Sequence, residues 1–309
     1  MSKKIFCPIC KIPFEISESN RIPCPTSSLS NSSKQWIAFC QFCELGILYP
    51  TQKKEETSHL YEGGSFWGKV SVSSKIQNYA MPYALAEARL KFILENSALK
   101  SVPSLKILDI GAGHGCFGMV AAKYFCKSLQ EYAIVEPDPR MLQRLEILWE
   151  KNVGGLLRLQ ATELLEKIEG RFDLIVISHV LEHLDNPKDL LSKAKNLLKS
   201  QGHIFIEVPH LDYRYKSDVL GHVLFFSPKQ LELLLSKVGF NHYQISVFGK
   251  NYRTTPMNPK TSKTLRGVEK TFHKLRKFLP YPVLSKFYRL AYGIESQNKE
   301  GTWIRALTK

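Results

Sequence analysis

The apolar positions between residues 105 and 208 fall into short blocks separated by segments with a different spacing. Each block is a nearly continuous apolar run, which is typical of a strand buried in a parallel sheet. Between the blocks, apolar residues recur at helical spacing, as Leu142, Leu145 and Leu148 do after Pro137 and Asp138. Strands that alternate with helices predict a doubly wound α/β fold. The expected strands are 105–110, 131–136, 155–160, 172–177 and 202–208, and the expected helices are 116–126, a helix starting at 137–138, a short one at 162–168, and 189–198.

Further elements flank this block. Helical spacing predicts a helix over 84–97, and residues 241–248 and 301–309 read as two more strands. An aromatic cluster precedes the first of these helices and either packs beneath it or forms a lid over a ligand. Its members are Tyr61, Phe66, Trp67, Tyr79 and Tyr83.

Residues suited to ligand binding follow the predicted strands. Gly111, Gly113 and Gly115 come directly after the strand 105–110, and a helix begins after them. Glycine allows close backbone approach, and the helix start offers free N–H groups. Glu136 ends the second strand, 21 residues after Gly115, where a carboxylate can accept both hydroxyls of a ribose. The alternative for Glu136 is a solvated acid at a strand end.

The N-terminal 50 residues contain two CxxC pairs. Cys7 and Cys10 form the first, and Cys40 and Cys43 form the second, with 29 residues between the pairs. Each pair can supply two thiolates to one tetrahedral ion, so we expect a structural zinc ribbon over residues 1–50, with 51–60 as a linker and 61–309 as the main domain. Cys24 is a weaker candidate ligand. Unligated thiols or a redox pair are the alternatives.

Charge is concentrated at the C-terminus. The chain has a formal net charge of +15, and residues 251–309 alone carry 13 Lys/Arg against 3 Asp/Glu. Within 258–296, apolar residues at helical spacing are surrounded by basic ones, which predicts a basic helical insert. It either covers the main domain with solvated charges or forms a cationic surface for phosphate groups or a membrane. Because the rest of the chain is nearly neutral, nucleic acid is a less favoured partner.

The sequence also bears on the compartment. No apolar run approaches the roughly 18 residues that span a bilayer, and the first residues lack the apolar core of a signal peptide. We therefore expect a cytoplasmic protein, with peripheral contact at the inner membrane face through residues 258–296. The oligomeric state is not indicated.

Five motifs occur in a characteristic order between residues 61 and 248. They resemble those of the class I S-adenosylmethionine (SAM)-dependent methyltransferases, in the branch that acts on small molecules. The resemblance implies a mostly parallel, seven-stranded Rossmann-like sheet, which the strands 241–248 and 301–309 would complete. The motifs are Asp109-x-Gly111-x-Gly113-x-Gly115, the acid Glu136, the strand 172–176, the segment 178–187, and the segment 221–228 with Leu231, Leu234, Gly239 and Phe240.

This resemblance implies roles for particular residues. The turn Gly111–Gly115 would contact the methionine part of SAM, with Asp109 orienting its amino end. Glu136 would hold the ribose hydroxyls, and Thr162, with Ala161, would lie near the adenine. Ser178 and His179 would border the sulfonium and the acceptor.

The histidines are candidates for a general base, which a hydroxyl or carbon acceptor requires. His179 and His183 are four residues apart and would share a face of a helical turn, with Glu182 beside them. These residues could instead hold a divalent metal, as in related quinone-biosynthesis O-methyltransferases, or His183 could merely cap and pack. His222 resembles the position of a base in zinc-ribbon sugar C-methyltransferases. We take His222, His183 and His179 as the catalytic candidates.

The sequence thus favours a SAM-dependent methyltransferase with SAM and structural zinc as its cofactors. The expected acceptor is a small, anionic, phosphorylated sugar or glycan, as in surface-polysaccharide biosynthesis. An RNA methyltransferase and a non-catalytic scaffold with a SAM-binding fold are the alternatives.

Overall fold

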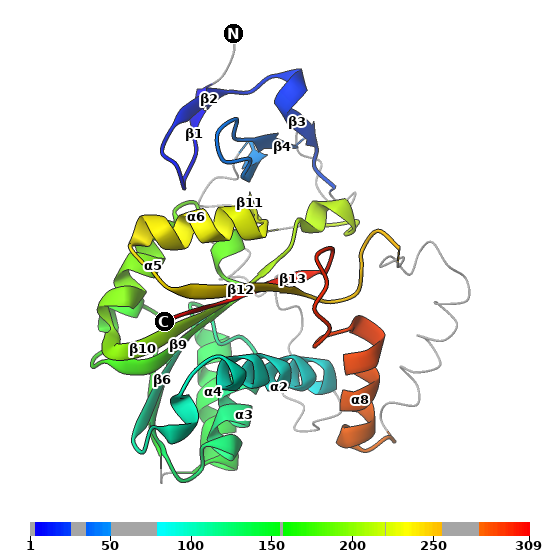
Figure 1. Ribbon diagram of the computed structural model, residues 1–309. Coiled ribbons are helices and arrows are strands. Elements are labelled where there is room, and N and C mark those ends of the chain that lie inside the picture. The colour runs from blue at the N-terminus through cyan, green and yellow to red at the C-terminus, as the bar shows by residue number, and fades with distance from the viewer. Residues whose placement is uncertain (1–3, 26–34, 51–78, 155–156, 220, 255–277) are drawn as a thin grey trace.

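A computed structural model describes the chain except for residues 1–3, 26–34, 51–78, 155–156, 220 and 255–277. Figure 1 shows a large α/β unit with a small β-rich unit on top of it. The predicted linker 51–60, most of the aromatic cluster and residues 258–277 of the basic insert lie outside the described residues. No helix among those described is long and apolar enough to cross a bilayer.

The large unit is built on a seven-stranded sheet with the order β12-β13-β10-β9-β6-β7-β8. All pairings among β10, β9, β6, β7 and β8 are parallel, and β13 runs antiparallel to both of its neighbours. The sequence prediction of a doubly wound, mostly parallel sheet is confirmed. The strands are β6 (Leu105–Ile110), β7 (Leu129–Val135), β8 (Arg158–Thr162), β9 (Phe172–Ser178), β10 (Leu198–Pro209), β12 (Tyr243–Phe248) and β13 (Trp303–Thr308).

Helices cover both faces of this sheet. The helices α2, α3 and α4 lie on one face, and α5 and α6 lie on the other, while α8 packs beside α2 (Figure 1). Their bounds are α2 (Ala80–Glu95), α3 (Cys116–Tyr124), α4 (Pro139–Asn152), α5 (Pro187–Asn196), α6 (Pro228–Val238) and α8 (Tyr281–Tyr292). Four short 3-10 turns lie between these helices and the strands: η3 (Leu99–Ser101), η4 (Leu165–Lys167), η5 (Leu181–His183) and η6 (Asp212–Arg214).

The alternation of side chains along each strand separates two apolar cores. In β6, Ile107 joins the core under α2, α3 and α4, whereas Leu108 and Ile110 join the core under α5 and α6. Residues of both sets are almost fully buried, which is why the strands read as continuous apolar runs rather than as alternating ones.

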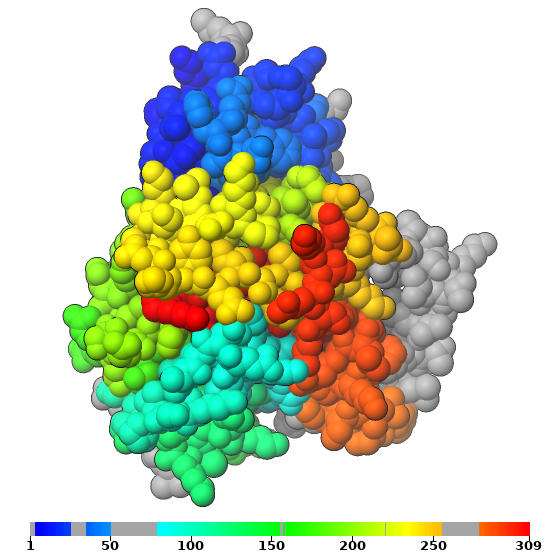
Figure 2. All heavy atoms as spheres, viewed as in Figure 1, coloured from blue at the N-terminus to red at the C-terminus, as the bar shows by residue number. Residues whose placement is uncertain are grey.

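The N-terminal unit shares the second of these cores. It consists of a two-stranded hairpin and a four-stranded sheet with the order β11-β5-β4-β3, in which β11 (Leu224–Phe225) comes from the large unit. Figure 2 shows the two units in broad contact, with the N-terminal one seated over α6. The described residues among the first 50 thus form a small β-rich unit that takes a strand from the rest of the chain. Its own elements are β1 (Lys4–Phe6), β2 (Pro13–Glu15), η1 (Glu18–Asn20), β3 (Arg21–Pro23), β4 (Trp36–Phe39) and β5 (Gly46–Tyr49).

Two local expectations are corrected. The segment expected to form a helix at 162–168 is only the 3-10 turn η4, because the turn is three residues long before the backbone becomes extended again. His179 does not share a helical turn with His183: its φ is +56°, and it follows the end of β9, before the 3-10 turn η5 begins at Leu181.

Candidate functional site

The glycine turn between β6 and α3 lies at the carboxyl edge of the sheet. Gly111, Gly113 and Gly115 all have φ between +54° and +73°, a region that favours glycine. A Cβ at position 111 would lie 2.4 Å from Val180 Cγ2, and one at position 115 would lie 2.4 Å from Leu145 Cδ2. Backbone conformation therefore favours glycine at all three positions, and close packing adds to this at positions 111 and 115.

Glu136 lies directly across this turn. Its Oε2 accepts a hydrogen bond of 2.9 Å from the Gly113 N–H, and its Oε1 accepts one of 3.2 Å from the Asp138 N–H. Its own N–H donates to the Thr162 carbonyl at 3.0 Å, which brings the ends of β7 and β8 together. Burial raises the pKa of Glu136, whereas the two backbone donors oppose that rise. The structure thus joins the predicted residues Gly113, Glu136 and Thr162 in one cluster.

Asp109 faces the interior rather than the open edge. It is 3 % exposed, and its Oδ2 accepts a 2.7 Å hydrogen bond from the Tyr132 hydroxyl. Burial raises the pKa of Asp109 to about 6, although the Tyr132 hydrogen bond opposes this rise. Asp109 therefore fixes β6 to β7 beneath the turn.

A buried cation lies beside the same turn. Arg144 is 5 % exposed, its Nη1 lies 3.2 Å from His114 Nδ1, and its guanidinium carbon is 4.8 Å from the centre of the Tyr79 ring. Burial and the charge of Arg144 lower the pKa of His114 to about 4, so the imidazole is neutral near pH 7. Tyr79, which the sequence placed in the aromatic cluster, also packs against His114 at 5.4 Å between ring centres.

Ser178 is the last residue of the neighbouring strand β9, and His179 follows it. The Ser178 hydroxyl oxygen is buried and has no hydrogen-bond partner among the described residues. His179 lies between two buried carboxylates, with Nδ1 at 3.0 Å from Glu182 Oε1 and Nε2 at 3.3 Å from Glu207 Oε1. Burial opposes the charged imidazole, but the two carboxylates outweigh it and raise the pKa of His179. A protonated imidazole has no lone pair for a proton, which argues against His179 as a base.

Glu207 is the centre of a buried charge network that sequence reasoning missed. Its Oε1 accepts hydrogen bonds from Arg89 Nε at 2.8 Å and Nη2 at 2.5 Å, and its Oε2 accepts one from Arg305 Nε at 2.6 Å. Glu207 and Arg305 are 0 % and 1 % exposed. Burial alone would raise the pKa of Glu207, but Arg89 and Arg305 hold it well below its usual range. An acid within the apolar run 202–208 was the available signal.

His222 and His183 form a second pair on the other side of Glu182. Their ring centres are 4.8 Å apart, edge to face. His183 Nδ1 lies 2.8 Å from the Gly221 carbonyl oxygen and donates a hydrogen bond to it. The lone pair of the neutral ring is therefore on Nε2, which lies 3.9 Å from Glu182 Oε1. The sequence analysis named His183 and His222 as separate candidates, and the structure brings them together.

Asp212 lies beside the Nδ1 atom of His222. Asp212 Oδ2 lies 2.9 Å from His222 Nδ1 and 2.9 Å from Lys216 Nζ, although the contact with His222 lacks the alignment of a hydrogen bond. Burial would raise the pKa of Asp212, but His222 and Lys216 lower it to about 2. An ionised carboxylate at Nδ1 favours the tautomer with its proton there and its lone pair on Nε2. Asp212 was not predicted; it lies just beyond the end of β10.

The His222 ring also takes part in a cluster with the composition of a metal site. The ligand atoms of Glu182, His183 and His222 all lie within 4.8 Å of one another. Two imidazoles and a carboxylate can hold a divalent transition metal. The geometry fits both a base and a metal ligand at His222, because Asp212 at Nδ1 favours a lone pair on Nε2 in either case.

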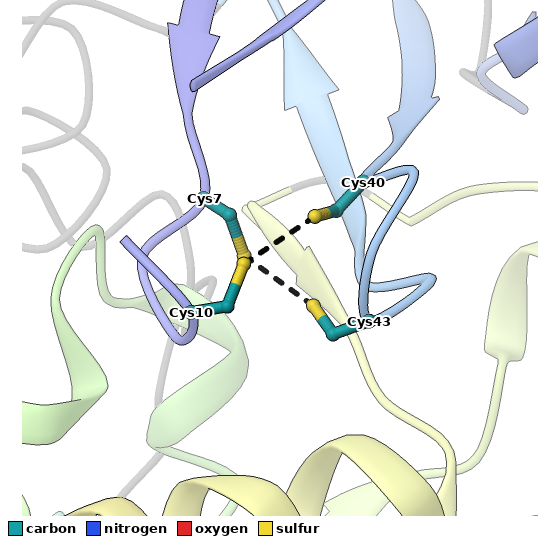
Figure 3. A group of neighbouring side chains, drawn as sticks. All are labelled: Cys7, Cys10, Cys40 and Cys43. Carbon is teal, nitrogen blue, oxygen red and sulfur yellow. Dashed lines mark hydrogen bonds between the residues drawn. The ribbon is translucent and has the colours of Figure 1, made fainter. Parts of the chain in front are cut away.

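The four predicted cysteines converge in the N-terminal unit. Their sulfur atoms all lie within 4.8 Å of one another, with Cys7 and Cys43 at 3.5 Å and Cys10 and Cys40 at 3.6 Å. Figure 3 shows the four side chains pointing inward from two separate turns. A tetrahedral zinc site with Zn–S distances of about 2.3 Å has sulfurs about 3.8 Å apart, so this cluster fits such an ion.

The two turns that carry these cysteines have the same backbone geometry. Lys11 N–H donates to the Cys7 carbonyl at 2.9 Å, and Glu44 N–H donates to the Cys40 carbonyl at 2.8 Å. Both Lys11 and Glu44 have φ near +60°. Cys24 is not a member of the four-sulfur cluster.

Comparisons with known proteins identify the family that the chain matches. A family model described as a methyltransferase domain matches residues 78–245, which is more than half of the chain. Ubiquinone biosynthesis O-methyltransferase from Xanthomonas campestris pv. campestris (strain B100) is 30% identical over 126 residues, covering 40% of this chain and 50% of the relative. The same enzyme from Dechloromonas aromatica (strain RCB) is 25% identical over 134 residues, covering 42% and 56%. The chain therefore spans about half the length of the curated relatives that it matches.

Similar solved structures include phosphoethanolamine N-methyltransferase 2 of Haemonchus contortus in complex with S-adenosyl-L-methionine. It has a TM-score of 0.47 and 18% identity, covering 78% of this chain and 60% of that one. A SAM-dependent methyltransferase of Thermotoga maritima has a TM-score of 0.44 and 15% identity, covering 76% and 90%. On the extent of the family match, the chain belongs to the methyltransferase domain family, which confirms at the level of the family the expected resemblance to class I SAM-dependent methyltransferases.

Proposed function

We propose that this protein transfers a methyl group from SAM to a small-molecule acceptor. The observation that carries the proposal is the glycine turn with the buried Glu136 carboxylate across it. The residues present suit the donor: Glu136 suits a ribose diol, and the turn has no room to spare for side chains at positions 111 and 115. The unpartnered Ser178 hydroxyl oxygen at the end of β9 adds a polar group to the same edge of the sheet.

The proposed division of labour follows from these positions. Bound SAM supplies a sulfonium-activated methyl group, so catalysis depends mainly on positioning the acceptor for in-line attack. The residues Gly111–Gly115 and Glu136 hold the donor. His222, oriented by Asp212, accepts the acceptor proton at Nε2. His179, whose protonated form is favoured by Glu182 and Glu207, borders the site.

Replacing Glu136 by glutamine is expected to weaken SAM binding by about 10- to 100-fold. The reason is that charge-assisted hydrogen bonds to the ribose, each worth about 1.5–3 kcal/mol, would become neutral ones. The amide oxygen of glutamine can still accept from the Gly113 N–H, whereas the longer hydrogen bond from the Asp138 N–H is lost because the amide NH2 group is a donor. Isothermal titration calorimetry with SAM measures the change.

Glu146→Gln is the matched control, since Glu146 is an exposed acid on α4 and its substitution removes the same charge. Equal SAM affinity in the wild type and Glu136→Gln would contradict the role of Glu136. No SAM binding by the wild type would leave the scaffold alternative.

For the acceptor, we propose a small, anionic, phosphorylated sugar or glycan, as in surface-polysaccharide biosynthesis. The support is the charge of the chain, with 13 Lys/Arg against 3 Asp/Glu in residues 251–309. The names of the similar ubiquinone biosynthesis O-methyltransferases favour a second candidate, a phenolic hydroxyl. Both acceptors need a base, which His222 supplies.

Labelled SAM with a panel of acceptors tests this choice. The panel contains nucleotide sugars, polyprenyl-phosphate sugars, catechols and total RNA. Label in a sugar fraction supports the proposal, whereas label in a catechol selects the phenolic acceptor. Label in RNA, with an affinity that falls steeply with salt, selects the RNA alternative.

The cytoplasmic location and peripheral membrane contact remain proposals, and α8 supports the second. Leu284 and Tyr288 are buried on one face of α8. In contrast, Val283 is 50 % exposed, Leu290 is 69 % exposed, and Phe278, which precedes the helix, is 85 % exposed. Exposed apolar residues beside basic ones suit the surface of an anionic bilayer.

Leu290→Asn is expected to reduce binding to vesicles of phosphatidylcholine and phosphatidylglycerol by about tenfold, because each buried large apolar side chain contributes about 1.5–3 kcal/mol. Co-sedimentation measures the binding. Ile147→Asn, at an exposed apolar position on α4, is the control. Equal loss in both variants, or no binding by the wild type, would reject the membrane contact.

A further inference from the structure

The four-cysteine cluster and the histidine rim are connected by a short path of backbone. The knuckle Cys40–Cys43 joins β4 to β5, and β5 pairs with β11. The first residue of β11 is Leu224, two residues after His222. The β5–β11 pairing is close: a Cβ on Gly46 would lie 3.0 Å from Phe225 Cβ. The N-terminal unit thus borders the segment 219–226 that carries His222.

Backbone hydrogen bonds hold this segment from both sides. On the N-terminal unit, Leu48 N–H donates to the Val223 carbonyl at 2.9 Å, and the Pro25 carbonyl accepts from Val219 N–H at 3.3 Å. On the large unit, Val223 N–H donates to the Glu182 carbonyl at 2.8 Å. Together with the contact from His183 Nδ1 to the Gly221 carbonyl at 2.8 Å, these bonds fix the relative positions of His183 and His222.

A side chain also reaches the cysteine turn itself. Gln230 is 2 % exposed, and its Nε2 donates to the Cys43 carbonyl at 2.6 Å. Its Oε1 accepts from Ser227 N–H at 2.8 Å at the start of α6. The Gln230 side chain therefore links the Cys43 turn to the residues that follow β11.

The glycine turn takes its hydrogen bonds from other strands. Gly111 N–H donates to the Val135 carbonyl at 2.7 Å, and Gly113 N–H donates to Glu136. Glu136 N–H in turn donates to the Thr162 carbonyl at the end of β8. The predicted donor site thus rests on β6, β7 and β8, whereas the segment that carries His222 is held by both the N-terminal unit and η5.

We propose that a metal ion held by Cys7, Cys10, Cys40 and Cys43 positions His222 and His183 through the β5–β11 pairing and the Gln230–Cys43 hydrogen bond, while the SAM site forms without it. The metal acts as a positioning element of the acceptor half of the site. Only the value of this positioning for catalysis rests on the proposed function. The coupling itself is a property of the fold.

Amide hydrogen exchange, followed by mass spectrometry on the full chain, tests the coupling without any acceptor. Zinc-loaded protein is compared with chelator-treated protein and with Gln230→Met, which keeps all four cysteines. In both cases we expect residues 222–226 to exchange at least about tenfold faster, with strands β6 and β7 unchanged and SAM affinity within about twofold. Elemental analysis is expected to give one zinc per chain for Gln230→Met.

Lys229→Met is the control for Gln230→Met. Lys229 is its neighbour and makes only an exposed ion pair with Glu44. If chelation unfolds the whole chain, Gln230→Met decides the outcome, because its metal site is intact. Unchanged exchange at 222–226 in Gln230→Met, or loss of SAM binding in Gln230→Met or in a metal-free chain that stays folded, would overturn the proposal. Failure of methyl transfer with the exchange result intact would instead reject the proposed function.

Discussion

Replacing His222 by glutamine is expected to slow methyl transfer by about two to four orders of magnitude while leaving SAM affinity unchanged. The magnitude is that of a general base removed from its substrate. Glutamine retains a polar group of similar reach, but it cannot accept a proton at neutral pH. The donor site is spared because it is formed by residues of β6, β7 and β8.

Replacing Asp212 provides a second test of the role of His222. Asp212 is 1 % exposed and ionised, and it lies 2.9 Å from His222 Nδ1. Asp212→Asn should lower the rate in the same direction, since the carboxamide no longer favours the tautomer with a lone pair on Nε2. An amide in place of a carboxylate preserves the volume, so the loss should appear in kcat more than in KM.

Transfer rates are measured with labelled SAM on the acceptor that the panel identifies. His203→Gln is the matched control, because His203 lies in the same chain at the start of the parallel part of β10 and bonds only the Thr308 carbonyl. A His222→Gln rate within threefold of the wild-type rate would remove His222 as the base. His183, whose Nε2 faces Glu182, would then be the next candidate.

The order of strands and helices could be predicted because each strand of this sheet is buried on both faces. That burial makes the strands appear as apolar blocks, and the glycines and Glu136 fall at their ends for the same reason. The paired cysteines were equally readable, since their spacing within each turn is set locally. Features that depend on neighbouring residues can be read from a short stretch of sequence. The four cysteines lie together as expected, and so do Gly113 and Glu136.

The missed residues depend on pairings between distant segments. Glu207 and Arg305 are register partners across the antiparallel pair β10–β13, 98 residues apart. Arg89 reaches the same carboxylate from α2. Nothing within the segment 202–208 indicates which cations will compensate its acid. The pairing of β11 with β5 was hidden in the same way, and a two-residue strand has no periodicity to read.

Glu207→Gln is expected to lower the free energy of unfolding by about 3–5 kcal/mol, the cost of breaking a buried ion pair from one side. Arg89 and Arg305 would keep their charges in a site with no compensating carboxylate at position 207. In a domain of this size the melting temperature should fall by about 10 °C. The substitution keeps the side-chain volume, so the loss reports charge rather than packing.

The pH dependence of this loss identifies its origin. The folded-state pKa of Glu207 lies well below its usual range because of Arg89 and Arg305. Its stabilising contribution is therefore complete above the unfolded-state pKa of about 4.3 and is lost as the pH falls toward the folded-state value. The gap between wild type and Glu207→Gln should be full at pH 7 and should shrink below about pH 4. Urea unfolding across this range measures it, with Glu166→Gln as the control, because the exposed ion pair of Glu166 with Lys193 is screened by solvent and its loss should leave the free energy of unfolding nearly unchanged. A gap that is small at pH 7, or that does not change with pH, would mean that packing rather than charge holds Glu207 between the two arginines.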